Sequence, residues 1–305
     1  MIVRPRPSFF ALLFILRGSI VPQIAPKVGA IVLVAVAAVG LQLLKPHWFQ
    51  GGTSTPFTLV GLSLSIFLSF RNTACYDRWW EGRKLWGQLI VEARSLARMT
   101  IALFPDAGDA ELRSRLLRRG IGFAYALEAR LRGRDEAAAA RPFVPASELA
   151  VLARGNAPQA LLAGVSGDLA EARRRGAIGD AIHGRLEERL TEMAGVQAGC
   201  ERIRSAPVPF AYTLLLHRTA YAFCLLLPFG LVSALGWWTP LTSAMVAYTL
   251  FGLDTLGDEL EQPFEPHQNG LPLKAMARII EIDLLTALGA PDIPPPLEPD
   301  DFVLL

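Results

Sequence analysis

Cysteine and histidine are scarce in this chain, and their scarcity excludes several kinds of site. The sequence has three cysteines and four histidines, all widely separated. No CxxC pair occurs, so neither a disulfide framework nor a zinc site is expected. The formal net charge of +2 gives little support to nucleic-acid binding. The acidic residues after position 254 have no His, Ser or Cys partner at a useful spacing, so we do not expect an enzyme.

Apolar residues are abundant and unevenly distributed. They make up 52% of the 305 residues, and the mean hydropathy of +0.34 is too high for an ordinary soluble domain. Residues 28–44 carry no charge, whereas residues 107–205 are dense in Arg, Asp and Glu. The chain therefore combines a membrane part with a soluble part.

The predicted fold is an all-α integral membrane protein with four transmembrane helices and a cytosolic helical bundle. The first two membrane helices lie within 28–70, and the other two form a hairpin around a Trp-containing turn at 236–240. The expected divisions are a cytoplasmic N-terminal segment 1–27, transmembrane helices in 28–70, a cytosolic helical domain 71–205, transmembrane helices in 206–253 and a cytosolic C-terminal segment 254–305.

Within the soluble part, helical periodicity predicts helices at 109–133, 146–154, 158–175 and 178–203. Residues 134–145 are expected to form a polar loop. The Pro-rich stretch 291–299 is expected to be extended. The prolines at 22 and 26 are expected to separate a short amphipathic N-terminal piece from the first membrane helix.

The distribution of Lys and Arg predicts the topology. The connections 45–55 and 236–240 contain one Lys and no Arg, whereas the flanks 1–27 and 71–98 together contain ten basic residues. By the positive-inside rule, both termini and the soluble domain are cytoplasmic, which four crossings allow. We expect a multi-pass protein of the cell inner membrane.

An apolar stripe runs along the second predicted membrane helix. Leu62, Ile66 and Phe70 recur every four residues and so share one helix face, while small residues such as Gly61 and Ser65 occupy other faces. Periodicity alone favours a helix–helix packing stripe. The sharper interpretation is a narrow hydrophobic constriction in a pore, which would gate by dewetting.

Three regions resemble the bestrophin family, in its bacterial branch. They are FRN at 70–72 with DRWWE at 77–81, PVPFAYTLLLHR at 207–218 and LGDELEQPF at 256–264. The resemblance implies a homopentameric ion channel with a central pore and no enzymatic activity. It places Leu62, Ile66 and Phe70 at the pore neck. It also implies a second aperture at the cytosolic exit, for which Ile178 and Ile182 are the candidates.

The resemblance leaves the permeant ion open. Animal members of the family pass chloride and similar anions. The alternative, suggested by bacterial members, is a channel of the same fold that passes monovalent cations such as sodium. Two charges near the neck bear on this choice. Asp77 is a candidate pore carboxylate or else a salt-bridge partner, and Arg71 is a candidate anion attractor or else an interhelix anchor.

Calcium is a doubtful cofactor, and no other cofactor or metal is expected. Animal bestrophins carry a calcium clasp on consecutive aspartates after the fourth helix. Here the matching segment retains only Asp258, Glu259 and Glu261, interrupted by Leu and Gln, and we regard them as a remnant of such a clasp. Apart from the channel, a membrane-anchored scaffold or signalling protein is the alternative from another functional class.

Overall fold

The computed structural model describes residues 1–4, 8, 10, 14–16, 18–49 and 55–304. Among these residues all regular secondary structure is helical. The β-type backbone pairing is limited to isolated β-bridges such as Ile2 with Val303. The chain forms two compact units. The apolar unit comprises Arg4–Trp79 and Pro207–Gln262, and the charged unit comprises Met1–Val3, Trp80–Ala206 and Pro263–Leu305.

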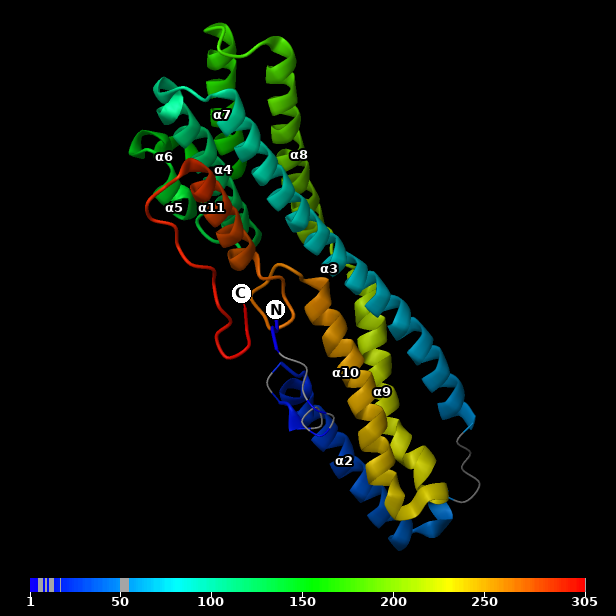
Figure 1. Ribbon diagram of the computed structural model, residues 1–305. Helices are drawn as coiled ribbons and strands as arrows, with labels where there is room; N and C mark the ends of the chain where they lie inside the picture. Colours follow the sequence, from blue (N-terminus) through cyan, green and yellow to red (C-terminus); the bar gives the residue numbers. More distant parts are fainter. Residues whose placement is uncertain (5–7, 9, 11–13, 17, 50–54, 305) are drawn as a thin grey trace. The chain divides into compact units, whose positions relative to one another are not determined.

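Among the described residues, four helices build the apolar unit (Figure 1). They are α2 (Val21–Leu44), the first half of α3 (Thr55–Leu103), α9 (Phe210–Leu235) and α10 (Thr239–Glu261), with a short 3₁₀ turn η1 (Pro46–Phe49) after α2. Helix α2 packs against both α9 and α10. The buried core contains Leu68 of α3, Cys224 of α9 and Phe251 of α10, so all these helices share one hydrophobic centre.

Three helical stretches are long and apolar enough to cross a membrane. They are Val21–Leu44, Thr55–Leu103 and Phe210–Glu261. The third stretch contains both α9 and α10, joined by the 3₁₀ turn η4 (Gly236–Trp238). Gly236 adopts φ 49°, a left-handed conformation that glycine tolerates better than other residues, and this allows the chain to reverse between the two helices.

The prediction of a break at Pro22 and Pro26 is wrong, because α2 already begins at Val21. Pro22 lies in the first turn, where the backbone N–H has no intrahelical acceptor in any case. Pro26 lies only one turn further and the helix continues through it. The amphipathic piece expected before this point falls mostly outside the described residues.

The charged unit is a helical bundle built around α4 (Ala110–Leu131). Helix α4 contacts α7 (Ala157–Arg174), α8 (Asp180–Ser205) and α11 (Leu273–Leu288). The second half of α3 also contributes buried side chains to the charged unit, including Trp86 and Leu96. The predicted helices at 109–133, 146–154, 158–175 and 178–203 are confirmed as α4, α6 (Ala146–Leu152), α7 and α8.

One local prediction fails in this unit, and one helix lies where none was predicted. The expected loop 134–145 contains α5 (Glu136–Ala140) and the 3₁₀ turn η3 (Arg141–Phe143), because Asp135 caps α5 by accepting a hydrogen bond from the Ala138 N–H. Helix α11 is not among the predicted helices, although it ends in a common way, at Gly289 in the left-handed conformation. The short 3₁₀ turn η2 (Ala107–Asp109) precedes α4.

Candidate functional site

The predicted neck residues lie on the exposed face of α3. Leu62, Ile66 and Phe70 are 61%, 46% and 63% exposed, whereas Leu64 and Leu68 on the opposite face are 2% and 0% exposed. The stripe therefore does not pack in the core of its own chain. Large apolar side chains left uncovered on a membrane helix require lipid, another subunit or a pore beside them.

Asp77 continues the exposed face of α3 beyond Phe70, as helical spacing predicts. Within the described part of the chain its carboxylate forms no ion pair, so the salt bridge that the sequence allowed is not present.

Arg71 is fully buried and lies on the opposite face of α3, so it cannot attract ions directly on the exposed face. Its Nη1 donates to the Asp254 carboxylate at 3.0 Å and to the Asp254 carbonyl oxygen at 3.3 Å. Its Nη2 donates to Asp258 and, at 3.4 Å, to Glu261. The interpretation of Arg71 as a pore charge is therefore not supported, and the guanidinium instead anchors α3 to α10.

Close backbone approach makes this anchor possible. A Cβ on Gly257 of α10 would lie 2.5 Å from Asn72 Oδ1 and 3.1 Å from Arg71 Nη1. A side chain at this position would therefore require the ends of the Asn72 and Arg71 side chains to shift away from α10. Glycine is the residue that lets Arg71 reach its acceptors.

His217 of α9 completes the polar cluster. Its Nδ1 lies 2.7 Å from Asp254 Oδ2, and its ring contacts Tyr221 with centroids 4.5 Å apart. Asp254 is 2% exposed, so its carboxylate is satisfied from both sides by Arg71 and His217. We call Arg71, His217, Asp254, Asp258 and Glu261 the α3–α10 anchor.

The acidic residues interpreted as a calcium-clasp remnant serve other contacts. Asp258 and Glu261 bind Arg71, Glu261 also accepts the Val208 N–H at 3.1 Å, and Glu259 accepts from Gln23 at 2.7 Å. No group of three or more metal-ligating side chains that could hold an ion occurs among the described residues. The carboxylates of Asp258 and Glu261 are therefore already bonded to a guanidinium, and that of Glu259 to an amide.

The sequence contains a signal for this cluster that spacing analysis can find. Asp254, Asp258 and Glu261 follow one another at intervals of four and three, which places them on one helix face. Three acidic groups on one face of an apolar helix require a cationic partner. Arg71 is the basic residue that ends the neighbouring apolar run.

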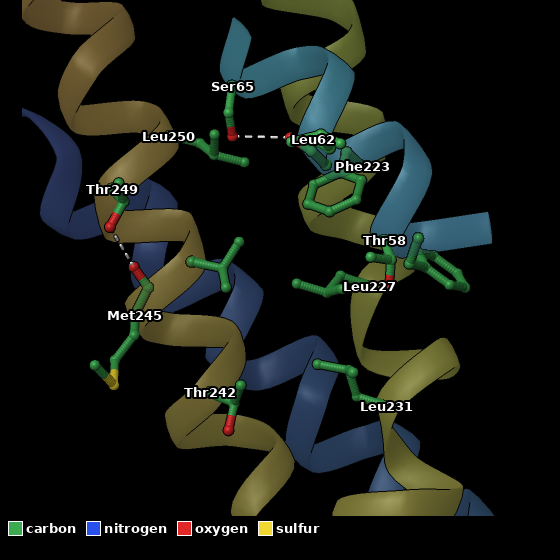
Figure 2. Close-up of a pocket in the computed structure, with 13 residues that line it drawn as sticks. Thr58, Leu62, Ser65, Phe223, Leu227, Leu231, Thr242, Met245, Thr249 and Leu250 are labelled. Atoms are coloured by element: carbon green, nitrogen blue, oxygen red, sulfur yellow. Dashed lines mark hydrogen bonds between the residues drawn. The ribbon is translucent and has the colours of Figure 1, made fainter. Parts of the chain in front are cut away.

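A cavity of about 490 Å³ lies beside the neck stripe, between α3, α9 and α10 (Figure 2). Leu62 and Ser65 line it from α3, facing Leu227 of α9 and Leu250 of α10. Three hydroxyls of the lining, those of Ser65, Thr242 and Thr249, donate to the carbonyl oxygen four residues earlier, as Ser65 does to Gly61 at 2.8 Å. The remaining lining is mostly apolar, so the cavity suits an apolar occupant.

A second apolar pocket of about 360 Å³ lies on the other side of α3, against α9. Leu59, Val60 and Phe67 of α3 line it together with Leu215 and other residues of α9. The exposed face of α3 is thus flanked by two different apolar depressions.

The structure separates the two candidates for the cytosolic aperture. Ile178 lies in the turn before α8 and is 5% exposed, whereas Ile182 lies in the first turn of α8 and is 36% exposed. A ring of side chains around an opening needs exposed members. The burial of Ile178 therefore makes Ile182 the better candidate.

Comparison with known proteins identifies the family of this chain. A family model described as "Bacterial/Fungal Bestrophin protein" matches residues 1–286. The chain is 47% identical over 304 residues to a voltage-dependent anion channel-forming protein of Mesorhizobium japonicum, covering 98% of this chain and 95% of the relative. It is 38% identical over 301 residues to the voltage-dependent anion channel-forming protein YneE of Escherichia coli K12, covering 98% of each.

A solved structure is similar as well. The crystal structure of a bacterial bestrophin homologue from Klebsiella pneumoniae superposes with a TM-score of 0.83 at 36% sequence identity, covering 87% of this chain and 98% of that chain. The three resembling segments, the all-helical fold of an apolar membrane protein and these matches over nearly the whole length agree. The chain belongs to the bestrophin family, in its bacterial and fungal branch.

Proposed function

We propose that this chain forms a voltage-dependent, bestrophin-like anion channel, a homopentamer whose α3 helices surround a central pore. The observation that carries the proposal is the exposed stripe of Leu62, Ile66 and Phe70 on a helix whose opposite face is buried. The names of the relatives, all described as voltage-dependent anion channel-forming proteins, support the direction of ion selectivity.

The two pockets beside α3 support ring assembly. They differ in lining, and they flank one exposed apolar face. A neighbouring copy whose apolar side chains fill one of these pockets would make a heterologous contact, and such contacts form a ring when the rotation between copies closes. The number five rests on the family resemblance, and the mass of the purified complex measures it.

In this arrangement four helices, α2, the first half of α3, α9 and α10, cross the cell inner membrane. Both termini and the charged unit then lie in the cytoplasm, as the excess of basic residues in 1–27 and 71–98 favours. Apolar rings at Leu62, Ile66 and Phe70 form the neck. Ile182 narrows the cytosolic exit.

The mechanism follows from the chemistry of the neck. Apolar side chains offer no ligand to replace the water shell of an ion, so the width of the neck decides whether a hydrated ion passes. The rings carry no charge and contribute little to selectivity. The α3–α10 anchor holds the pore helix from behind, through the buried Arg71 on the face opposite the stripe.

A cation channel of the same fold is the second candidate, because Asp77 presents an uncompensated carboxylate on the exposed face of α3. Five such carboxylates in a ring would favour sodium over chloride. The two candidates differ in the sign of the reversal potential under an asymmetric salt gradient.

The test is planar bilayer recording of the purified protein in asymmetric NaCl. Wild type is compared with Ile66→Ala and with Leu225→Ala, a matched truncation of an exposed apolar residue on α9. We expect a reversal potential near that of chloride, voltage-dependent opening and a severalfold larger current in Ile66→Ala alone. Equal currents in all three proteins would refute the assignment of the neck. A reversal potential near that of sodium, lost in Asp77→Asn, would favour the cation channel over the anion channel.

A further inference from the structure

The charged unit contains a cavity that the channel mechanism does not use. It has a volume of about 660 Å³ and lies between α4, η3, α11 and the segment that follows α11. Arg118, Phe143 and Leu285 line it, together with Ala290–Pro294. A smaller cavity of about 300 Å³ adjoins it and shares Arg118, Pro142 and Phe143. Volumes of roughly 300–1,000 Å³ are typical of small-molecule sites.

Arg118 is the feature that gives this cavity a chemical preference. Its Nε donates to Ser114 Oγ at 3.2 Å, and within the described ranges it forms no ion pair. Its neighbours on α4 differ, since Arg115 and Arg119 both bind Asp168, at 3.1 Å and 2.7 Å. Both terminal nitrogens of Arg118 therefore retain their capacity to bind an anion in the fork geometry that carboxylates fit.

The carboxylate of Glu281, which also lines the cavity, is already compensated. It accepts a hydrogen bond from the Tyr125 hydroxyl at 2.6 Å and lies 2.8 Å from Arg278 Nε. Asp292 is the other acidic residue of the lining, and it is exposed and not paired with Arg118. Arg118 thus supplies the available positive charge, and Asp292 weakens its attraction for anions.

The rest of the lining is apolar and partly aromatic. The Phe143 ring stacks on Tyr125 with centroids 5.2 Å apart and an interplanar angle of 16°, so it is held as a fixed wall. Pro142, Leu285 and Ile293 add further apolar surface. This wall suits a flat or branched hydrocarbon body beside the charged group.

We propose that this cavity binds a small organic carboxylate with an aromatic or branched apolar body, with Arg118 holding its carboxylate. The ligand would touch both α11 and the segment 290–294. Beyond the cavity, that segment is tied to α11 by the Arg278 bond to the Pro295 carbonyl oxygen at 3.1 Å. Further along the chain, the C-terminal residues contact the N-terminus, where the Met1 amine donates to the Leu304 carbonyl oxygen at 2.6 Å. Binding would therefore fix the C-terminal segment on the charged unit.

The test is isothermal titration of 3-phenylpropionate into the full-length purified protein at constant ionic strength. The neutral 3-phenylpropionamide serves as the comparison ligand. We expect saturable binding of one carboxylate per chain, and weakening by about ten- to a hundredfold for the amide or for Arg118→Gln, as loss of a charged hydrogen bond predicts. Asp292→Asn should tighten binding a few-fold.

Arg154→Gln is the matched control, because Arg154 is an exposed arginine outside the cavity with no ion pair among the described residues. It removes the same charge and should leave binding unchanged. No saturable heat with 3-phenylpropionate at millimolar concentration overturns the proposal. So does equal binding of acid and amide, or an equal effect of Arg118→Gln and Arg154→Gln.

Discussion

Replacing Arg71 by Met is expected to destabilise the apolar unit strongly. The substitution keeps an unbranched chain of similar length but removes the guanidinium. Asp254, which is 2% exposed, then keeps His217 at 2.7 Å as its remaining ion-pair partner. Burying a carboxylate costs free energy because the group loses its hydration. The attraction to the guanidinium offsets this cost, so the cost destabilises the folded state once the guanidinium is removed.

The magnitude follows from the exposure of each partner. Breaking a buried ion pair by removing one member costs roughly 3–5 kcal/mol. Because His217 Nδ1 still lies within hydrogen-bond distance of Asp254, we expect the lower end, about 3 kcal/mol. Asp258 is half exposed, so its share of the cluster is at most about 1 kcal/mol. At roughly 2–4 °C per kcal/mol, Arg71→Met should lower the midpoint of thermal unfolding by about 6–12 °C.

The assay is thermal unfolding of the detergent-purified protein at one fixed scan rate, since membrane proteins often unfold irreversibly and the midpoint then depends on rate. Asp258→Asn is the control and should lower the midpoint by no more than about 4 °C. The double variant Arg71→Met with Asp254→Asn should recover much of the loss, because neither charge remains buried. The reasoning is refuted if Arg71→Met is no less stable than Asp258→Asn.

Two further predictions concern the charged unit, and a third concerns the cysteines of both units. Ile178→Ala should cost about 2–4 kcal/mol of stability because Ile178 is buried, whereas Ile182→Ala should leave the unfolding midpoint nearly unchanged and raise the single-channel current. Burial raises the pKa of Tyr125 to about 12, above its ordinary value of about 10. The stability that the protonated Tyr125 hydroxyl contributes to the folded state should therefore be full below about pH 10 and decline as the pH rises towards 12. Above about pH 10 the midpoint of thermal unfolding should fall less steeply in Tyr125→Phe than in the wild type. Burial likewise raises the pKa of the Cys200 thiol to about 12, and all three cysteines are buried, so iodoacetamide at pH 8 should label the native protein at none of them and the unfolded chain at all, as counted by mass spectrometry.

The sequence alone is sufficient to predict which face of α3 carries the neck stripe. Residues spaced by four share a helix face whatever surrounds the helix, so Leu62, Ile66 and Phe70 can be grouped by their spacing. Spacing cannot decide whether that face packs in a core or remains exposed. That answer depends on which other helices reach α3, and two of them, α9 and α10, lie more than 100 residues away along the chain.

The role of Arg71 is harder to predict for the same reason. A basic residue at the end of an apolar run is usually an interfacial anchor, and nothing nearby in the sequence indicates complete burial. Its acceptors Asp254 and Asp258 are contributed by α10. Helix α11 is a different case, because Leu273, Ala277, Ile280 and Leu284 follow helical spacing and are buried, so its signal is present in the sequence.

The α3–α10 anchor also has a consequence for how this sequence can vary. Arg71 contacts both Asp254 and Gly257, so a substitution at one of these three positions changes which residues are tolerated at the other two. A homologue in which Arg71 is replaced would also need a neutral residue in place of Asp254, or it would be less stable. Substitutions at these three positions should therefore arise together among descendants of this gene, whereas exposed Asp258 should drift independently.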